Sequence, residues 1–220
     1  GKEPHDTFSN DQHPDKKFDY ILINPPFNDS EWGGEKYEAD SKWVFGKPPN
    51  GNANYAWIQL VIHKLNETGK AGIILGSKSL DSSPSQIEYT IRKKIINNDL
   101  VEAIILLPEK LFVNTTTGIC IWILNKNKIR KNETLFVNYE NKSEPLPGSR
   151  KLKRITDESI NELEQIITSW RVNKNYKDIK GITKSVSLNQ IQNENWNLSP
   201  KRYVGINSIN NNISLNLSDY

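Results

Sequence analysis

The sequence predicts an α/β fold with a mostly parallel sheet, an antiparallel edge strand and a C-terminal helical appendage. Short apolar runs alternate with helical patterns along residues 1–140, which is typical of strand–helix–strand units. The third and fourth apolar runs are separated by too few residues for a helical crossover, so we expect those two strands to be antiparallel neighbours. After residue 150 the pattern is mainly helical.

Five strands are expected from these runs. The first, Phe-Asp-Tyr-Ile-Leu-Ile at residues 18–23, is rich in aromatic and β-branched side chains and is stopped by Asn24 and two prolines. The other four runs lie at residues 71–75, 100–107, 118–124 and 134–139. Because the runs are short and strongly apolar, we expect most of these strands to be buried.

Two helices are expected between the strands. Apolar side chains cover most faces of residues 53–66, so this helix should be well buried, and Gly69 should end it. Ser83 and Pro84 suit the N-cap and the first position of a second helix. Its buried side should carry isoleucines at four-residue spacing, namely Ile87, Ile91 and Ile95.

The C-terminal region follows a linker that contains two prolines. An apolar stripe predicts an amphipathic helix over residues 156–170, and a short helix is expected at 187–192. We therefore divide the chain into three parts. They are an α/β part at residues 1–140, a helical region at 141–205 and a flexible tail at 206–220.

Composition excludes several classes of protein. The formal net charge of +3 permits a polyanionic partner without demanding one. The single cysteine, Cys120, rules out an internal disulfide and a Cys-x-x-Cys metal site; it fits a reducing compartment, so we expect a cytoplasmic protein. No apolar run approaches the ~18–20 residues that a membrane span needs. Because the chain contains no Met, we expect it to be part of a longer protein.

Asn24-Pro25-Pro26-Phe27 combines a favourable position with useful chemistry. It follows a predicted buried strand, and open α/β sheets bind ligands at the carboxyl ends of their strands. The Asn24 side chain and the Pro25 backbone each offer a carbonyl oxygen, and the two prolines restrict the backbone that holds them. Two converging acceptors suit an exocyclic amino group, and Phe27 offers a flat face to a planar base. Such a site could help an aromatic amine to attack a methyl donor.

The segment FDYILINPPF resembles motif IV of amino-methyltransferases that use S-adenosylmethionine, in the NPPF form of DNA adenine-N6 methyltransferases. Downstream stretches resemble the modification (M) subunit of type I restriction–modification systems. They are NANYAWIQ at 52–59, GKAGIIL at 69–75, IRKK at 91–94, LVEA at 100–103, LP at 107–108, LF at 111–112, NT at 114–115 and LSPKRYVG at 198–205. The resemblance covers residues 1–205.

The resemblance implies a partial Rossmann-like methyltransferase sheet and methyl transfer from S-adenosylmethionine to adenine N6 in DNA. Asn24 and Pro25 would accept hydrogen bonds from N6, Pro26 would shape the turn, and Phe27 would stack on a base extruded from the duplex. Asp6, within an HDTF segment, resembles the acid that binds the adenine of the cofactor. The resemblance also implies a specificity (S) subunit that reads the DNA sequence and a restriction (R) subunit, with no membrane partner.

One part of the family pattern is missing from this sequence. A glycine-rich cofactor loop of the DP-x-x-G-x-G kind should precede NPPF by many tens of residues, but the chain contains no G-x-G. The acid that would hold the ribose hydroxyls is missing as well. We therefore expect residues 1–140 to be the C-terminal half of a methyltransferase catalytic domain, with an incomplete cofactor pocket and no activity alone.

Two other functions stay open. The chain could be a non-catalytic fragment that retains contacts with the specificity subunit or with DNA. It could instead be an amino-methyltransferase that acts on RNA or on a protein glutamine, although the downstream type I stretches argue against this.

Several further features have two interpretations. Trp32 and Trp43 could contact DNA or could hold the long loop at residues 28–52 against the core. The basic residues Lys126, Lys128, Arg130 and Lys131 could form a solvated turn or bind phosphate. Residues 114–118 are interpreted as a hairpin turn, and Cys120 as buried and inert.

Overall fold

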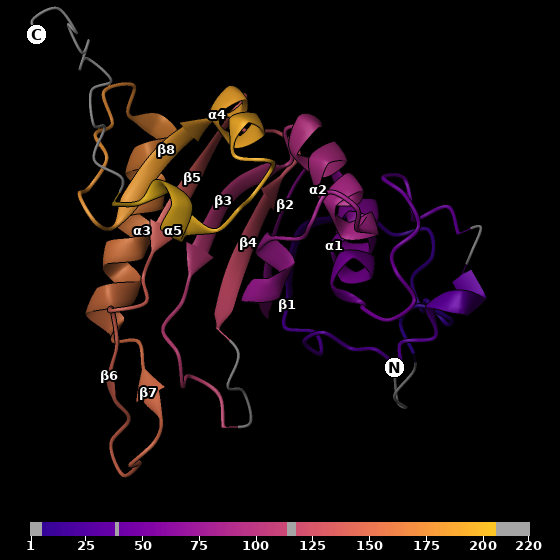
Figure 1. Ribbon diagram of the computed structural model, residues 1–220, viewed down its shortest axis with the longest axis horizontal. Coiled ribbons are helices and arrows are strands. Elements are labelled where there is room, and N and C mark those ends of the chain that lie inside the picture. The colour runs from indigo at the N-terminus through magenta and orange to yellow at the C-terminus, as the bar shows by residue number, and fades with distance from the viewer. Residues whose placement is uncertain (1–5, 38–39, 114–117, 206–220) are drawn as a thin grey trace, which may run out of the picture.

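A computed structural model describes residues 6–37, 40–113 and 118–205 (Figure 1). Its main sheet is formed by β1 (Phe18–Ile23), β2 (Leu65–Gly76), β3 (Val101–Leu106), β4 (Ile119–Asn125), β5 (Glu133–Asn138) and β8 (Thr183–Ser187). The helices are α1 (Asn54–Lys64), α2 (Ile87–Asn97), α3 (Asp157–Val172), α4 (Leu188–Asn193) and α5 (Pro200–Tyr203). Short 3-10 turns lie at Gly34–Tyr37 and Ser77–Leu80, and β6 (Glu144–Pro145) pairs with β7 (Lys153–Arg154).

The sheet order is β1-β2-β4-β3-β5-β8. β1 is parallel to β2 and β3 is parallel to β5, whereas β4 lies antiparallel between β2 and β3, and β8 is an antiparallel edge strand. Four of the six strands therefore point the same way, which confirms the predicted mixed, mostly parallel α/β class. The predicted antiparallel pairing of the third and fourth strands is also confirmed, and it places β4 inside the sheet.

β2 begins earlier than the sequence predicted. The expected helix through residue 66 ends at Lys64, and Leu65 already pairs with Phe18 of β1. Gly69 therefore lies within the strand instead of ending a helix. The register between β1 and β2 shifts after Phe18, and a Cβ on Gly69 would lie 2.9 Å from the Phe18 carbonyl oxygen. A side chain at residue 69 would collide with the backbone of β1 where the register shifts, so glycine is required at this position.

Helix α2 begins later than predicted, at Ile87 instead of Ser83. The Gln86 side chain accepts a hydrogen bond from the Ser83 amide at 2.7 Å, which closes a turn before the helix. Pro84 lies in that turn. Ile91 and Ile95 are buried as expected, but Ile87, at the helix start, is 52% exposed.

Helices cover both faces of the sheet (Figure 1). One apolar core joins α1, α2 and the segment after β8 to inward-facing residues of the strands, among them the fully buried Trp122. A second core lies on the opposite face, where Ile166, Ile167 and Trp170 of α3 pack on β3 and β5. The predicted helix at 156–170 is confirmed as α3, and Thr156 is its N-cap: the Thr156 hydroxyl accepts a hydrogen bond from the Ser159 amide at 3.2 Å.

A buried ion pair anchors the end of α3 to the sheet. The Glu102 side chain on β3 is 1% exposed, and Arg171 of α3 donates to both of its oxygens, at 3.1 and 2.6 Å. Asn125, at the end of β4, donates to the same carboxylate at 2.9 Å. This pair fixes the orientation of α3 as well as its position, because the guanidinium and the carboxylate form a bidentate pair with two hydrogen bonds.

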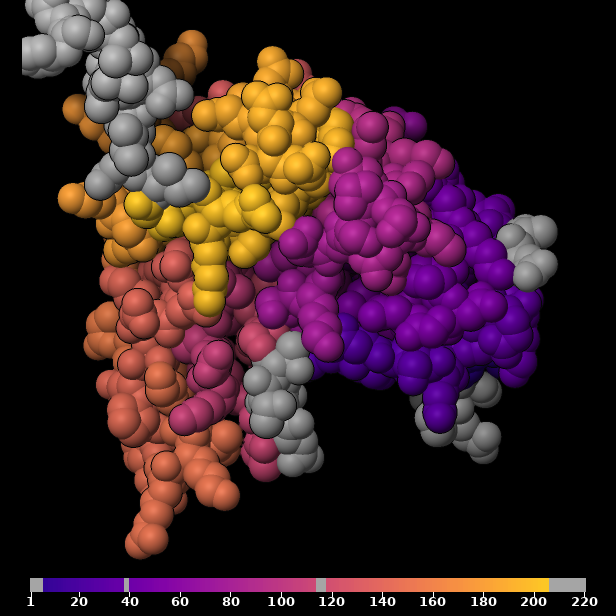
Figure 2. Space-filling view, viewed as in Figure 1, coloured from indigo at the N-terminus to yellow at the C-terminus, as the bar shows by residue number. Residues whose placement is uncertain are grey.

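The C-terminal segment is integrated into the fold. The polar strand β8 pairs with β5, and the short helix predicted at 187–192 is confirmed as α4, with a capping box between Ser187 and Gln190. The fully buried Arg92 of α2 donates to the Trp196 carbonyl at 2.7 Å and to the Ser82 hydroxyl at 2.6 Å. Figure 2 shows the C-terminal residues lying against α2 on one face. The division at residues 140 and 205 stays a prediction, and the tail at 206–220 lies outside the described residues.

Candidate active site

The carboxyl ends of β1, β2 and β3 lie at one edge of the sheet, because these three strands point the same way. β1 is followed by a long loop that contains the 3-10 turn Gly34–Tyr37, and β2 is followed by the 3-10 turn Ser77–Leu80. After β3, the described residues 107–113 form neither helix nor strand. This is the edge at which open α/β sheets bind ligands. The predicted tetrapeptide therefore stands where a catalytic loop is expected.

Asn24 is exposed, and the adjoining Pro25 is buried. Within the described part of the chain, no residue forms a hydrogen bond with the Asn24 side chain, so its carbonyl oxygen can accept one from a ligand. The Pro25 ring restricts the backbone immediately after Asn24. The arrangement places an unoccupied amide on a rigid base, whereas Pro26 is exposed in the turn that follows.

Phe27 is half-buried and contacts Phe112, which comes from the loop after β3. The two ring centroids lie 6.0 Å apart with an interplanar angle of 82°, an edge-to-face geometry. Phe112 therefore restrains the ring that would face a planar base. Sequence analysis assigns Phe112 no role beyond the LF match at 111–112, because nothing in the local sequence indicates that this loop reaches Phe27.

Asp6 is fixed by the neighbouring backbone and by the long loop. One carboxylate oxygen accepts from the Phe8 amide at 3.0 Å, and the other accepts from the Tyr37 hydroxyl at 3.1 Å. Partial burial acts to raise the pKa of Asp6, but hydrogen bonds from Phe8, Ser9 and Tyr37 outweigh it and lower the pKa below its ordinary value. The group is thus an anion at neutral pH. The structure describes no contact between Asp6 and the tetrapeptide, so the predicted cofactor contact stays a prediction.

The long loop after the tetrapeptide is held by an aromatic cluster. Trp32 and Trp43 are buried, and their indole nitrogens donate to the Pro49 and Tyr37 carbonyls at 3.2 and 2.7 Å. Their rings pack edge to face at 6.0 Å, and both contact Phe8. Of the two interpretations of these tryptophans, the structure supports the one in which they hold the loop against the core.

The basic residues after β4 mainly stabilise the fold. Lys128 is buried and forms an ion pair with Asp99 at 2.5 Å. Arg130 donates to the Trp170 and Asn173 carbonyls, and Lys126 donates to the Leu65 carbonyl at 2.8 Å. These contacts favour the turn over the phosphate-binding interpretation. Cys120 is fully buried as predicted, and burial raises the pKa of its thiol to about 12.

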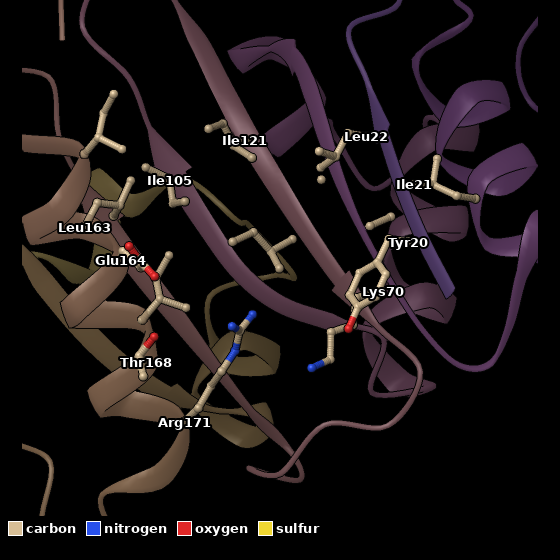
Figure 3. A pocket seen from close by; sticks show the side chains of 15 residues that line it. Tyr20, Ile21, Leu22, Lys70, Ile105, Ile121, Leu163, Glu164, Thr168 and Arg171 are labelled. Atoms are coloured by element: carbon tan, nitrogen blue, oxygen red, sulfur yellow. The ribbon is translucent and has the colours of Figure 1, made fainter. Parts of the chain in front are cut away.

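An apolar groove lies beside β1, on the face that carries α3. It encloses about 670 Å³, and Figure 3 shows side chains of β1 and α3 on its two sides, with Ile105 of β3 and Ile121 of β4 between them. The prediction that residues 18–23 form a buried strand is wrong: none of the six residues of β1 is buried, and Tyr20 and Leu22 are 76% and 85% exposed. The apolar run indicated the strand correctly, but β1 lies at the border of the sheet, where little covers it. Among the described strands, only β2 pairs with β1, so the outer edge of β1 is open.

Two further features bear on the class of site. Within the described residues, no group of three or more His, Cys, Asp or Glu side chains is placed to hold a metal ion. No described helix combines the length and the apolar character that crossing a bilayer requires. The predicted hairpin turn at 114–118 falls largely on residues 114–117, which lie outside the described residues.

Comparison with known proteins identifies the family of this chain. The family model described as N-6 DNA Methylase matches residues 1–212. The type I restriction enzyme HindI methylase subunit of Haemophilus influenzae is 42% identical over 205 residues, which cover 93% of this chain and 46% of that protein. The MjaIX methylase subunit of Methanocaldococcus jannaschii is 35% identical over 214 residues, which cover 91% of this chain and 37% of that protein.

Solved structures show the same fold. The crystal structure of a type I restriction–modification methyltransferase subunit from Streptococcus thermophilus matches with a TM-score of 0.78 and 25% identity, covering 90% of this chain and 41% of that one. The type I restriction enzyme EcoKI M protein matches with a TM-score of 0.63 and 14% identity, covering 88% and 45%. The chain thus spans less than half the length of each of these relatives. Since the family model spans nearly the whole sequence and the relatives agree with it, the chain belongs to the N-6 DNA methylase family.

Proposed function

We propose that this chain is the part of a type I restriction–modification methylase subunit that binds and orients the target adenine during methylation of N6. The observation that carries the proposal is the exposed Asn24 amide, free of described partners, at the carboxyl end of β1. The relatives support the reaction class, since they are named as methylase subunits of type I restriction enzymes.

The geometry suits activation of an amino group. The Asn24 side-chain oxygen and the Pro25 carbonyl would accept the two N6–H bonds and so stabilise the positive charge that develops as N6 attacks. These acceptors would hold N6 with its lone pair directed at the activated methyl group that a bound methyl donor would supply, and N6 would release a proton once it had gained the methyl. Phe27, restrained by Phe112, would stack on the base, which must first leave the duplex.

S-adenosylmethionine would supply the activated methyl group when bound. We propose that Asp6 contacts its adenine, because the lowered pKa of Asp6 keeps an anionic acceptor on a fixed backbone. The fit is partial, since no G-x-G segment is available in this sequence to approach the cofactor closely. We therefore propose that residues outside this chain complete the pocket. A specificity subunit that reads DNA and a restriction subunit are the proposed partners.

Methyl transfer to DNA tests the assignment. The complete methylase subunit, assembled with its specificity subunit, would be assayed with radiolabelled S-adenosylmethionine and unmethylated duplex DNA. Asn24→Ala should lower the rate on the order of 10²-fold or more, because an acceptor for the developing charge is lost. Asn97→Ala is a matched control, since Asn97 is an exposed asparagine at the end of α2.

Three results would contradict the proposal. Full activity of Asn24→Ala would remove the role assigned to its amide. Methylation of RNA or of a protein glutamine in preference to DNA would favour another amino-methyltransferase. Absence of transfer to every acceptor, from a subunit that still binds its partners, would indicate a non-catalytic chain.

A further inference from the structure

The chain leaves the NPPF tetrapeptide through a tight, left-handed turn. Asn28, which directly follows Phe27, has a φ of 53°. Steric crowding makes this region unfavourable for most residues, and asparagine is among the few that enter it readily. Such a turn persists only when neighbouring contacts hold it.

Those contacts come from a single residue, Asn54, at the start of α1. The Asn28 amide nitrogen donates to Oδ1 of Asn54 at 3.2 Å, and Nδ2 of Asn54 donates back to Oδ1 of Asn28 at 2.9 Å. Asn54 is 2% exposed and Asn28 is half-buried, so the two bonds are partly sheltered from water. The side-chain oxygen and nitrogen of Asn54 thus bind the backbone N–H and the side-chain oxygen of Asn28. These two bonds fix the orientation of the turn as well as its position.

Asn54 is itself held in a rigid frame. Its backbone amide donates to Oδ1 of Asn52 at 2.9 Å, and the Ala53 amide donates to the Asp29 carbonyl at 2.9 Å. The side-chain amide of Asn28 also lies close to Gly76 at the end of β2, since a Cβ on Gly76 would be 3.1 Å from Asn28 Nδ2. The turn after Phe27 is thus clamped between the start of α1 and the end of β2.

We propose that Asn54 is a positioning residue for methyl transfer, which acts by holding the Asn28 turn and, through it, the Asn24 amide and the Phe27 ring. The inference rests on the proposed function. Rates of transfer are sensitive to small displacements, and a misplacement of about 1 Å can cost about 10²-fold. Loss of the clamp should therefore lower kcat while leaving the binding of cofactor and DNA largely intact.

Two variants separate the clamp from the strain of the turn. Asn54→Ala removes both hydrogen bonds, whereas Asn28→Gly keeps the left-handed backbone and removes the Asn28 side-chain acceptor. If the two residues act as one clamp, the double variant should be no slower than the slower single variant.

Asn125→Ala is the matched control for burial. Asn125 is also 2% exposed, and it makes one donated and one accepted side-chain bond, to Glu102 and from the Asn127 amide. It ends β4, which runs antiparallel to β2, so it lies at the opposite edge of the sheet from NPPF. Its loss should lower the melting temperature without a specific fall in kcat.

The experiment measures kcat, KM and melting temperature for the complete methylase subunit with its specificity subunit. Fluorescence of 2-aminopurine at the target position reports how the extruded base is held. Asn54→Ala should lose about 10²-fold in kcat at an unchanged KM for S-adenosylmethionine, with altered 2-aminopurine fluorescence.

The outcomes distinguish the inference from the proposed function. Wild-type kcat for Asn54→Ala, or a loss that only follows melting temperature as for Asn125→Ala, would overturn the positioning role. If Asn24→Ala is inactive in the same assay, the proposed function survives that result. If Asn24→Ala is fully active, the proposed function itself fails.

Discussion

Arg171→Leu is expected to destabilise this chain by about 3 kcal/mol. Removing one partner of a buried ion pair costs about 3–5 kcal/mol, because the remaining charge is left uncompensated. Here Glu102 stays buried at 1% exposure, and it would lose two hydrogen bonds, at 3.1 and 2.6 Å. The lower end of the range applies because Asn125 still donates to the carboxylate and the Arg171 side chain is 27% exposed, so water can enter.

Urea unfolding followed by tryptophan fluorescence measures this effect, since the indole rings of Trp122 and Trp170 are buried. Adding Glu102→Gln to Arg171→Leu should recover about 2 kcal/mol, because a neutral amide needs no cation. A cost below about 0.5 kcal/mol for Arg171→Leu, the range of ordinary surface substitutions, would refute the reasoning. So would a double variant that is no more stable than Arg171→Leu.

Three other outcomes are expected. Burial raises the pKa of the Cys120 thiol from 9.0 to about 12, so DTNB should react with it at neutral pH only after the chain unfolds. Because the thiol loses its proton at lower pH in the unfolded chain than in the folded one, the free energy of unfolding should fall as the pH rises from 9 to 12. The isolated chain should self-associate through the open edge of β1, and Leu22→Lys should reduce the association measured by sedimentation. A wild-type chain that sediments as a monomer would contradict this expectation. Phe112→Ala should cost about 1 kcal/mol of transition-state stabilisation, which is about fivefold in kcat/KM. An unchanged kcat/KM would show that Phe112 does not hold the Phe27 ring for catalysis.

The parts of the fold that the sequence predicted are those with strong local patterns. The apolar run of β1 and its abrupt stop at Asn24 locate a strand and its carboxyl end, and the apolar stripe after residue 155 locates α3. β8 escaped prediction because Thr-Lys-Ser-Val-Ser is largely polar, and only its pairing with β5 makes it a strand. Likewise, the polar residues after Leu65 resemble a loop until their pairing partners are known.

The candidate site divides in the same way. Asn24 through Phe27 are contiguous, so both their chemistry and their place after a strand can be inferred from sequence. Phe112 and Asn54 reach the site from other segments, and Asn54 lies 26 residues beyond Asn28. An asparagine among many other asparagines carries no local sign of such a contact. These supporting residues become visible only in three dimensions.

The strand order has a consequence for the order of folding during synthesis. β2 and β3 do not pair with each other; each pairs with β4, although β4 follows both in the chain. A nascent chain that has not yet released residue 125 from the ribosome therefore holds the NPPF loop on one strand pair and the Phe112 loop on a separate strand. Only insertion of β4 brings these loops together. The two halves of the candidate site are joined late, by a strand that contributes no proposed catalytic residue of its own.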